Sequence, residues 1–134
     1  MGLGGSMQLL IVEDEPKDMR LAASAGEACG FSSIEAKSSA FSARVYLQEG
    51  IEGHFSLPDA IVLDLDLGYD SGFELLRFWH SDPQLAKIPL VVWTALGDQY
   101  REICRMFRVA AFVYKGEDRS VLQSVLLGLT AHSV

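Results

Sequence analysis

Four apolar segments of this sequence each end in a polar side chain that could do chemistry. These side chains are Glu13 with Asp14, Asp64, Thr94 and Lys115. Carboxylates that lie close together raise one another's pKa values, and a hard divalent cation such as Mg²⁺ relieves that repulsion through oxygen ligands. A hydroxyl and an ammonium beside them would bind an anion. Together these groups could perform phosphoryl transfer, in which a carboxylate can itself become an aspartyl phosphate.

The segments that precede these side chains are predicted to be buried strands, because they are short, apolar and bounded by turn residues. We predict five strands, at residues 7–12, 31–37, 60–63, 90–93 and 110–114. Helices are predicted at about residues 17–29, 39–50, 71–79, 97–107 and 117–129. Strands and helices that alternate in this way form a parallel sheet with right-handed crossovers. The predicted fold is therefore α/β, a single doubly wound five-stranded parallel sheet flanked by five helices.

The predicted fold would bring the polar side chains to one edge of the sheet. In an open parallel sheet, ligands bind beyond the carboxyl ends of the strands, where the strand order reverses. With the order 2-1-3-4-5, that point lies between the first and third strands. Glu13 and Asp14 would then lie beside Asp64, with Thr94 and Lys115 on the next two strands.

Apolar stripes on the predicted helices are expected to face the sheet, because residues three or four apart share one side of a helix. In the second helix the expected inward residues are Phe41, Val45, Tyr46 and Leu47. In the fourth helix they are Tyr100, Ile103, Met106 and Phe107.

The composition predicts one globular domain. The chain has 134 residues, of which 49% are hydrophobic. Residues 1–6 are expected to be a linker or tag remnant, and residues 7–134 the domain. The net charge of −7 argues against direct binding of nucleic acid or of an anionic membrane surface. The two cysteines lack paired or metal-ligand spacing, which indicates reduced thiols and a cytoplasmic location.

The residues at the strand ends resemble those of the receiver domains of two-component response regulators, the CheY-like family. The resemblance covers essentially the whole predicted domain. Glu13-Asp14 matches the family's acidic pair, Asp64 its phosphoacceptor, Thr94 its threonine or serine, and Lys115 its lysine. The successive intervals, from Asp14 to Asp64, from Asp64 to Thr94 and from Thr94 to Lys115, are 50, 30 and 21 residues, which are typical of the family.

The resemblance implies a phosphoacceptor and a metal site. Asp64 would accept a phosphoryl group from a histidine kinase or a histidine phosphotransfer protein. Glu13, Asp14 and Asp64 would hold Mg²⁺ together with the backbone carbonyl of Asp66. The side chain of Asp66 itself can equally be an ordinary solvated loop carboxylate.

The resemblance also implies a switch. Thr94 and Lys115 would hold the phosphoryl oxygens, and Phe112 falls at the family's aromatic switch position. Movement of Thr94 toward the phosphoryl group would rearrange Phe112 and change the surface of the fourth helix, fifth strand and fifth helix. Without the resemblance, an aromatic residue in this strand is simply expected in the core.

Some positions match the family and others depart from it. Gly72 matches the glycine eight residues after the phosphoacceptor. Gly68 stands where the family usually has proline, and Arg108 stands at a position that is commonly glycine. Gly116 replaces the proline that usually follows the lysine, so the customary cis peptide bond is not expected here.

Two other functions remain as alternatives. The chain could be a receiver-like docking domain that works without phosphorylation. Asp64-Leu65-Asp66 also resembles the DxD motif of haloacid-dehalogenase-type phosphatases, although that motif normally follows the first strand of a longer chain. Each polar residue, taken alone, has an ordinary structural role, and only the joint pattern favours the receiver.

The receiver hypothesis predicts self-catalysed phosphotransfer and dephosphorylation, not an enzyme that acts on a separate substrate. The sequence contains no recognisable output domain. The output would therefore pass through an unknown partner, or through a domain fused to this one in a longer regulator or hybrid kinase. A homodimer is possible.

Overall fold

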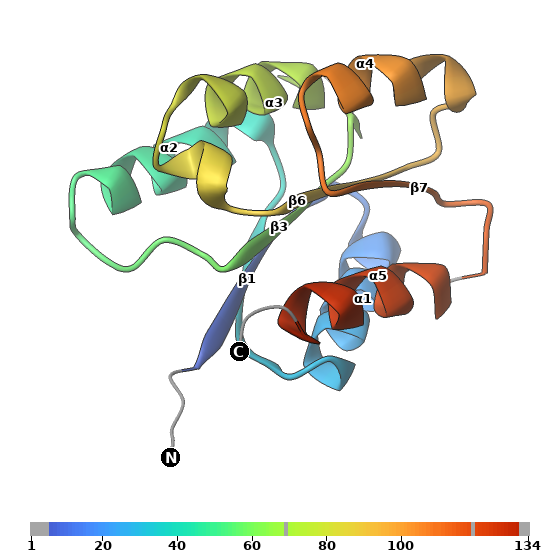
Figure 1. Cartoon of the computed structure of the whole chain (residues 1–134), viewed down its shortest axis with the longest axis horizontal. Helices are drawn as coiled ribbons and strands as arrows, with labels where there is room; N and C mark the ends of the chain where they lie inside the picture. Colours follow the sequence, from blue (N-terminus) through green and yellow to red (C-terminus); the bar gives the residue numbers. More distant parts are fainter. Residues whose placement is uncertain (1–5, 69, 119, 132–134) are drawn as a thin grey trace.

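A five-stranded parallel sheet forms the centre of the molecule in a computed structural model that describes residues 6–68, 70–118 and 120–131 (Figure 1). The expected linker, residues 1–6, lies outside the described residues except for its last residue. The sheet has the order β2-β1-β3-β6-β7. Its strands are β1 (Met7–Val12), β2 (Phe31–Lys37), β3 (Ala60–Leu63), β6 (Leu90–Thr94) and β7 (Ala111–Tyr114). This is the predicted order 2-1-3-4-5, and the fold prediction is confirmed.

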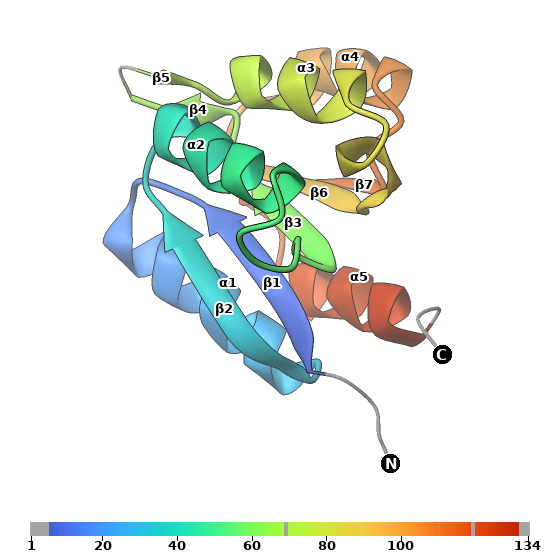
Figure 2. The same cartoon turned by 90° about the vertical axis from the view of Figure 1, so that its left-hand side faces the viewer.

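Helices cover both faces of the sheet. They are α1 (Pro16–Ala28), α2 (Ala40–Ile51), α3 (Gly72–Ser81), α4 (Arg101–Met106) and α5 (Ser120–Ala131), with short 3₁₀ turns η1 (Leu85–Lys87) and η2 (Asp98–Tyr100). Figure 2 shows α1 and α5 on one face and α2, α3 and α4 on the other. The layers follow from strand geometry, because successive side chains of a strand point to opposite faces. In β1, Leu9 and Ile11 pack toward α1 and α5, whereas Leu10 and Val12 pack toward α2 and α3.

The prediction for the inward face of α2 is partly wrong. Leu47 is buried as expected, but Phe41 is 73% exposed and Val45 is 43% exposed. The stripe that faces the sheet is made of small residues together with Leu47, namely Ala40, Ala43, Leu47 and Gly50. A stripe of small residues brings the helix close to the sheet and turns the larger neighbouring side chains outward.

The side of α4 that faces the sheet also differs from the predicted one. Cys104 is the buried residue of this helix, whereas Ile103 and Met106 are exposed. Tyr100 and Phe107, which lie about one helical turn on either side of Cys104, are partly buried against the core as predicted. Ile103 and Met106 are themselves three residues apart, so they form a second apolar stripe that periodicity could not distinguish from the true one.

A two-stranded antiparallel hairpin, absent from the prediction, joins β3 to α3. It consists of β4 (Asp66–Leu67) and β5 (Asp70–Ser71). Gly68 turns the chain with a φ of +69°, which explains why proline is absent here, since proline holds φ near −65°. An oxygen of Asp70 accepts a hydrogen bond from the backbone N–H of Phe41 at 2.8 Å. The hairpin is thereby fastened to the first turn of α2, where a carboxylate is favoured.

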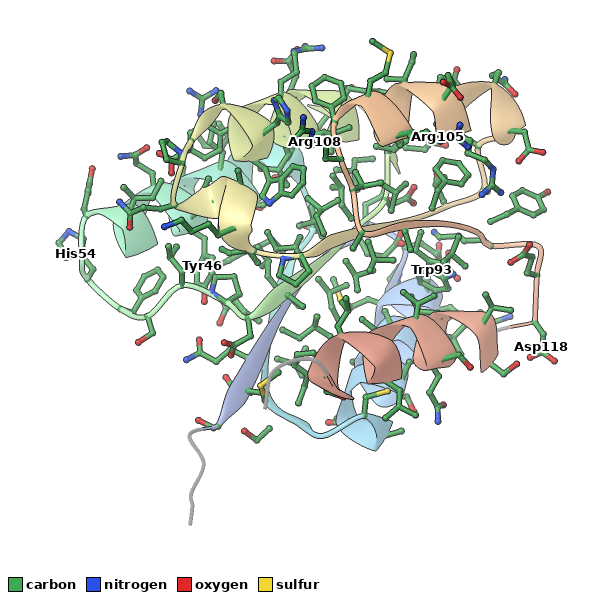
Figure 3. The ribbon with its side chains drawn as sticks, in the orientation of Figure 1. Tyr46, His54, Trp93, Arg105, Arg108 and Asp118 are labelled. Carbon is green, nitrogen blue, oxygen red and sulfur yellow. The ribbon has the colours of Figure 1, made fainter. Side chains whose placement is uncertain are left out.

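Arg108 ends α4 in the left-handed backbone conformation, with a φ of +62° (Figure 3). Its backbone N–H donates to the carbonyl of Arg105, and the N–H of Val109 donates to that of Cys104. This pair of bonds is the Schellman motif, whose left-handed residue is usually glycine because any Cβ is strained there.

Arg108→Gly is therefore expected to raise the free energy of unfolding by about 1 kcal/mol, since relief of the Cβ strain exceeds the backbone entropy that glycine loses. Urea denaturation of the purified domain measures the change. Arg108→Ala is the matched control, because it removes the same side chain but keeps the Cβ atom. Equal stabilisation by both substitutions would show that the arginine side chain, not the backbone, is the source of the effect.

Candidate active site

The ends of the parallel strands bring the predicted site residues to one edge of the sheet. The backbone N–H groups of Glu13, Asp64 and Lys115 each donate to a carbonyl of the neighbouring strand, at 2.8 to 3.0 Å. The strand ladder therefore continues to these residues. Their side chains, together with Asp14, line one acidic cleft.

The ammonium group of Lys115 lies at the centre of this cleft. Its Nζ atom donates to Glu13 Oε1 at 2.8 Å, to Asp18 Oδ2 at 2.8 Å and to Asp64 Oδ2 at 2.9 Å. The same atom lies 4.9 Å from the centre of the Trp93 ring. Trp93 lies on the α1 and α5 side of the sheet (Figure 3). Burial works to lower the pKa of Lys115, but the three carboxylates outweigh it and raise the pKa above its usual value. The lysine is therefore a fixed positive charge among negative ones.

Glu13 is the most deeply buried carboxylate of the cleft, with 2% of its surface exposed. Burial raises its pKa from the usual 4.5 to about 7, even though Lys115 and the backbone N–H of Glu15 donate hydrogen bonds to it. The nearby charge of Asp64 raises it further. Asp64 is also buried, and its second oxygen accepts from the backbone N–H of Asp66 at 3.0 Å.

The raised pKa of Glu13 predicts that the metal-free protein loses stability as the pH rises. A carboxyl group with a higher pKa in the folded state binds more protons when folded, so its contribution is present below pH 4.5 and is lost as the pH rises through 7. We expect the free energy of unfolding to fall by about 1–2 kcal/mol between pH 5.5 and 8 from this group.

Urea denaturation in the presence of EDTA measures this slope. Glu13→Gln, which cannot ionise, is the matched variant and should show a flatter pH dependence than the wild type. A slope that is the same in both proteins would assign the pH dependence to other groups.

Glu13, Asp14 and Asp64 could together hold a metal ion. One carboxylate oxygen from each lies within 4.8 Å of the others, with Glu13 and Asp64 buried and Asp14 exposed. Clustered carboxylate oxygens with one side open to water suit a hard divalent cation. Gly68 borders this side of the cleft, since a Cβ atom there would lie 3.4 Å from Asp14 Oδ2.

Thr94 and Phe112 are not among the residues that line the cleft. Thr94 is completely buried at the end of β6, and its hydroxyl oxygen accepts from the backbone N–H of Leu96 at 3.3 Å. It does not line the cleft, where the next residue, Ala95, is found instead. Phe112 is partly buried in β7, and the guanidinium carbon of Arg101 lies 4.8 Å from its ring centre. The structure thus places Phe112 between the core and α4.

Gly72 packs against the backbone of Asp64 and Leu65. A Cβ atom at Gly72 would lie 2.6 Å from the Cα atom of Leu65 and closer still to the carbonyl oxygen of Asp64. The N–H of Gly72 donates to the carbonyl of Leu65 at 3.1 Å. The first turn of α3 therefore packs directly on the backbone that carries Asp64.

Asp18 is a member of the cleft that the sequence analysis missed. It lies in the first turn of α1, where an acidic residue is ordinarily favoured by the helix dipole. No local signal in the sequence indicates this role, because the contact with Lys115 spans 97 residues of sequence.

Comparison with known proteins identifies the fold family. No protein-family model and no curated protein match the sequence. Among solved structures, the phosphorylated cyanobacterial phytochrome response regulator RcpA is 27% identical, with a TM-score of 0.78 over 93% of this chain and 91% of that one. This chain has the fold of CheY-like receiver domains.

Other response regulators have the same fold at lower identity. The Mn²⁺-bound response regulator Rcp1 is 24% identical, with a TM-score of 0.77 over 93% of this chain and 92% of that one. The chemotaxis response regulator CheY4 of Vibrio cholerae is 15% identical, with a TM-score of 0.77 over 93% and 99%. None of the helices in the described part of this chain is long and apolar enough to cross a membrane.

Gly116 follows Lys115 just beyond the end of β7. All peptide bonds among the described residues are trans, as expected from glycine in place of proline after Lys115. A Cβ atom at Gly116 would collide with the ring of Tyr114. The tyrosine ring thus occupies the space beside the chain where a side chain would otherwise project.

Proposed function

We propose that Asp64 accepts a phosphoryl group from a histidine kinase or a histidine phosphotransfer protein, in a reaction that depends on Mg²⁺. The observation that supports this most strongly is the 2.9 Å contact between Lys115 Nζ and Asp64 Oδ2, beside the carboxylates of Glu13 and Asp14. The similarity to phosphorylated RcpA points the same way.

The chain's own residues supply the nucleophile and a counter-charge. An oxygen of Asp64 forms the new bond to phosphorus while the bond from phosphorus to the donor's imidazole nitrogen breaks. The electron pair of that bond stays on the nitrogen, which takes up a proton. Lys115 is positioned to neutralise charge on the phosphoryl oxygens, an effect that is large in a partly buried site. Because the carboxylate is itself the nucleophile, no other residue has to form a covalent bond to the phosphoryl group.

The carboxylates of Glu13, Asp14 and Asp64 are the residues that would hold Mg²⁺, and their spacing fits such an ion. When bound, the cation would supply charge neutralisation for the transferred group. A response regulator of similar fold, Rcp1, has a Mn²⁺-bound form, which supports a divalent cation for this chain. The predicted contribution of the Asp66 backbone carbonyl belongs to the same proposal.

The proposed output surface consists of α4, β7 and α5. Exposed apolar side chains lie on all three of these elements, namely Ile103, Met106, Tyr114 and Leu127. Phe112 lies under this surface with Arg101 against its ring. We propose that Thr94, by moving toward the phosphoryl group, allows Phe112 to rearrange and changes this surface for a partner or a fused output domain.

Trp93 provides the test, because its indole ring lies beside Lys115. Its fluorescence is followed while Mg²⁺ and then beryllofluoride, which mimics a phosphoryl group, are added. We expect a saturable, Mg²⁺-dependent change that is lost in Asp64→Asn. Trp93→Phe is the control for the source of the signal, since Trp79 lies elsewhere, with its indole nitrogen bonded to the carbonyl of Ile88.

The outcomes separate the proposed function from its alternatives. Absence of any response, together with no phosphoryl adduct after treatment with acetyl phosphate, would favour a docking domain that works without phosphorylation. Rapid turnover of a generic phosphate ester would favour the DxD phosphatase, in which Asp66 acts as acid and base. We propose instead that the domain catalyses only its own phosphorylation and dephosphorylation, as receiver domains do.

A cytoplasmic location is part of the proposal. The two free thiols, Cys29 and Cys104, are both buried and suit a reducing compartment. The partners are those of two-component signalling, as for the phytochrome response regulators of similar structure.

A further inference from the structure

All three N–H donors of Lys115 are in use. An ammonium group has three donors, and the lysine gives them to Glu13, Asp18 and Asp64. A phosphoryl oxygen can therefore bind Lys115 only after one of these carboxylates has left it. Which carboxylate leaves determines how easily the site accepts the phosphoryl group.

Asp18 is the carboxylate that is released at the lowest cost. The side chains of Glu13 and Asp64 are 1% and 6% exposed, whereas that of Asp18 is 25% exposed. Water can replace the lysine at Asp18 but has little access to the two buried carboxylates. The position of Asp18 in the first turn of α1 also favours its negative charge when the lysine has moved away.

We propose that Asp18 occupies the N–H donor of Lys115 to which a phosphoryl oxygen would bind, and that this competition lowers the affinity of the domain for the phosphoryl group. This inference rests on the proposed function. Asp18 is a positioning residue that acts through Lys115 and does not touch the reacting atoms. Its contact at 2.8 Å keeps the ammonium toward α1 until the anion displaces it.

Beryllofluoride binding at saturating Mg²⁺ tests the proposal, with Trp93 fluorescence as the readout. Asp18→Asn is expected to lower the Kd for beryllofluoride by about 3- to 10-fold, the range for one partly exposed charge contact. Asp18→Glu restores the charge on a longer side chain and should return the Kd toward the wild-type value. Circular dichroism checks that each variant is folded.

A double-mutant cycle distinguishes positioning from a general charge effect. In a Lys115→Ala background, Asp18→Asn should leave the Kd unchanged, because Asp18 then has no lysine to hold. Glu15→Gln is the matched control. Glu15 lines the same cleft, and its carboxylate accepts a hydrogen bond from the backbone N–H of Lys17. The substitution therefore removes one negative charge from the cleft without removing a partner of the Lys115 ammonium. Its effect should be less than twofold.

Three results would overturn the inference. One is a Kd for Asp18→Asn within twofold of the wild type. Another is the same tightening in the Lys115→Ala background, and the third is equal tightening by Glu15→Gln. In each case the wild-type protein still binds beryllofluoride, so the proposed function stands. Failure of the wild type to bind would overturn both.

Discussion

Asp64→Asn is expected to abolish phosphorylation of the domain and leave it folded. An asparagine has no carboxylate oxygen to attack phosphorus, and loss of a nucleophile commonly reduces a reaction by at least about 100-fold. The fold should persist because the change also removes a negative charge beside Glu13, which relieves repulsion in the cleft. Lys115 keeps two of its three carboxylate partners, Glu13 and Asp18.

Intact-mass spectrometry after incubation with acetyl phosphate and Mg²⁺ measures the effect as the fraction of protein that carries a phosphoryl group. Asp66→Asn is the matched control, because it removes an exposed carboxylate two residues away and keeps the backbone N–H that bonds Asp64. Undiminished labelling of Asp64→Asn would exclude Asp64 as the acceptor. Turnover of phosphate esters that disappears in Asp66→Asn would instead support the phosphatase alternative.

The sequence predicts the strand ends well because the same local rule applies at each. A short apolar strand stops at its first polar residue, and parallel strands bring those stops to one edge. Glu13, Asp64 and Lys115 accordingly converge in the structure. The fold class follows from the alternation of strands and helices, which needs no knowledge of which residues touch.

The sequence does not show features that depend on the rotation of a helix about its axis, or on contacts between residues that lie far apart in the chain. In α2 and α4, apolar residues are too frequent for periodicity to choose one face, so Phe41 and Met106 were expected inside and lie outside. The contact of Asp18 with Lys115 depends on how α1 sits against β7 across the intervening strands. Gly68 explains the hairpin after β3 only once its positive φ is known.

Gly72→Ala is expected to destabilise the domain and slow its phosphorylation. The new Cβ atom would collide with the backbone of Asp64 and Leu65, which cannot rotate away as a side chain can. Either α3 or the Asp64–Leu65 peptide must shift. Such overpacking costs about 1–3 kcal/mol of unfolding free energy. A displaced Asp64 should also be phosphorylated more slowly by roughly 10-fold or more, because phosphoryl transfer is sensitive to the position of the nucleophile.

Gly128→Ala is the matched control for this substitution. Gly128 lies within α5, and a Cβ atom there would have no neighbour within 4 Å. Alanine in a helix interior is favoured over glycine, so this variant should gain about 0.5–1 kcal/mol and be phosphorylated at the wild-type rate. Urea denaturation and the rate of labelling by acetyl phosphate measure both variants. If Gly72→Ala lost stability but kept the wild-type labelling rate, then α3 would have moved and Asp64 would have stayed. The close approach at Gly72 would then serve folding alone, and the position of the acceptor would be set entirely by the ladder between β1 and β3.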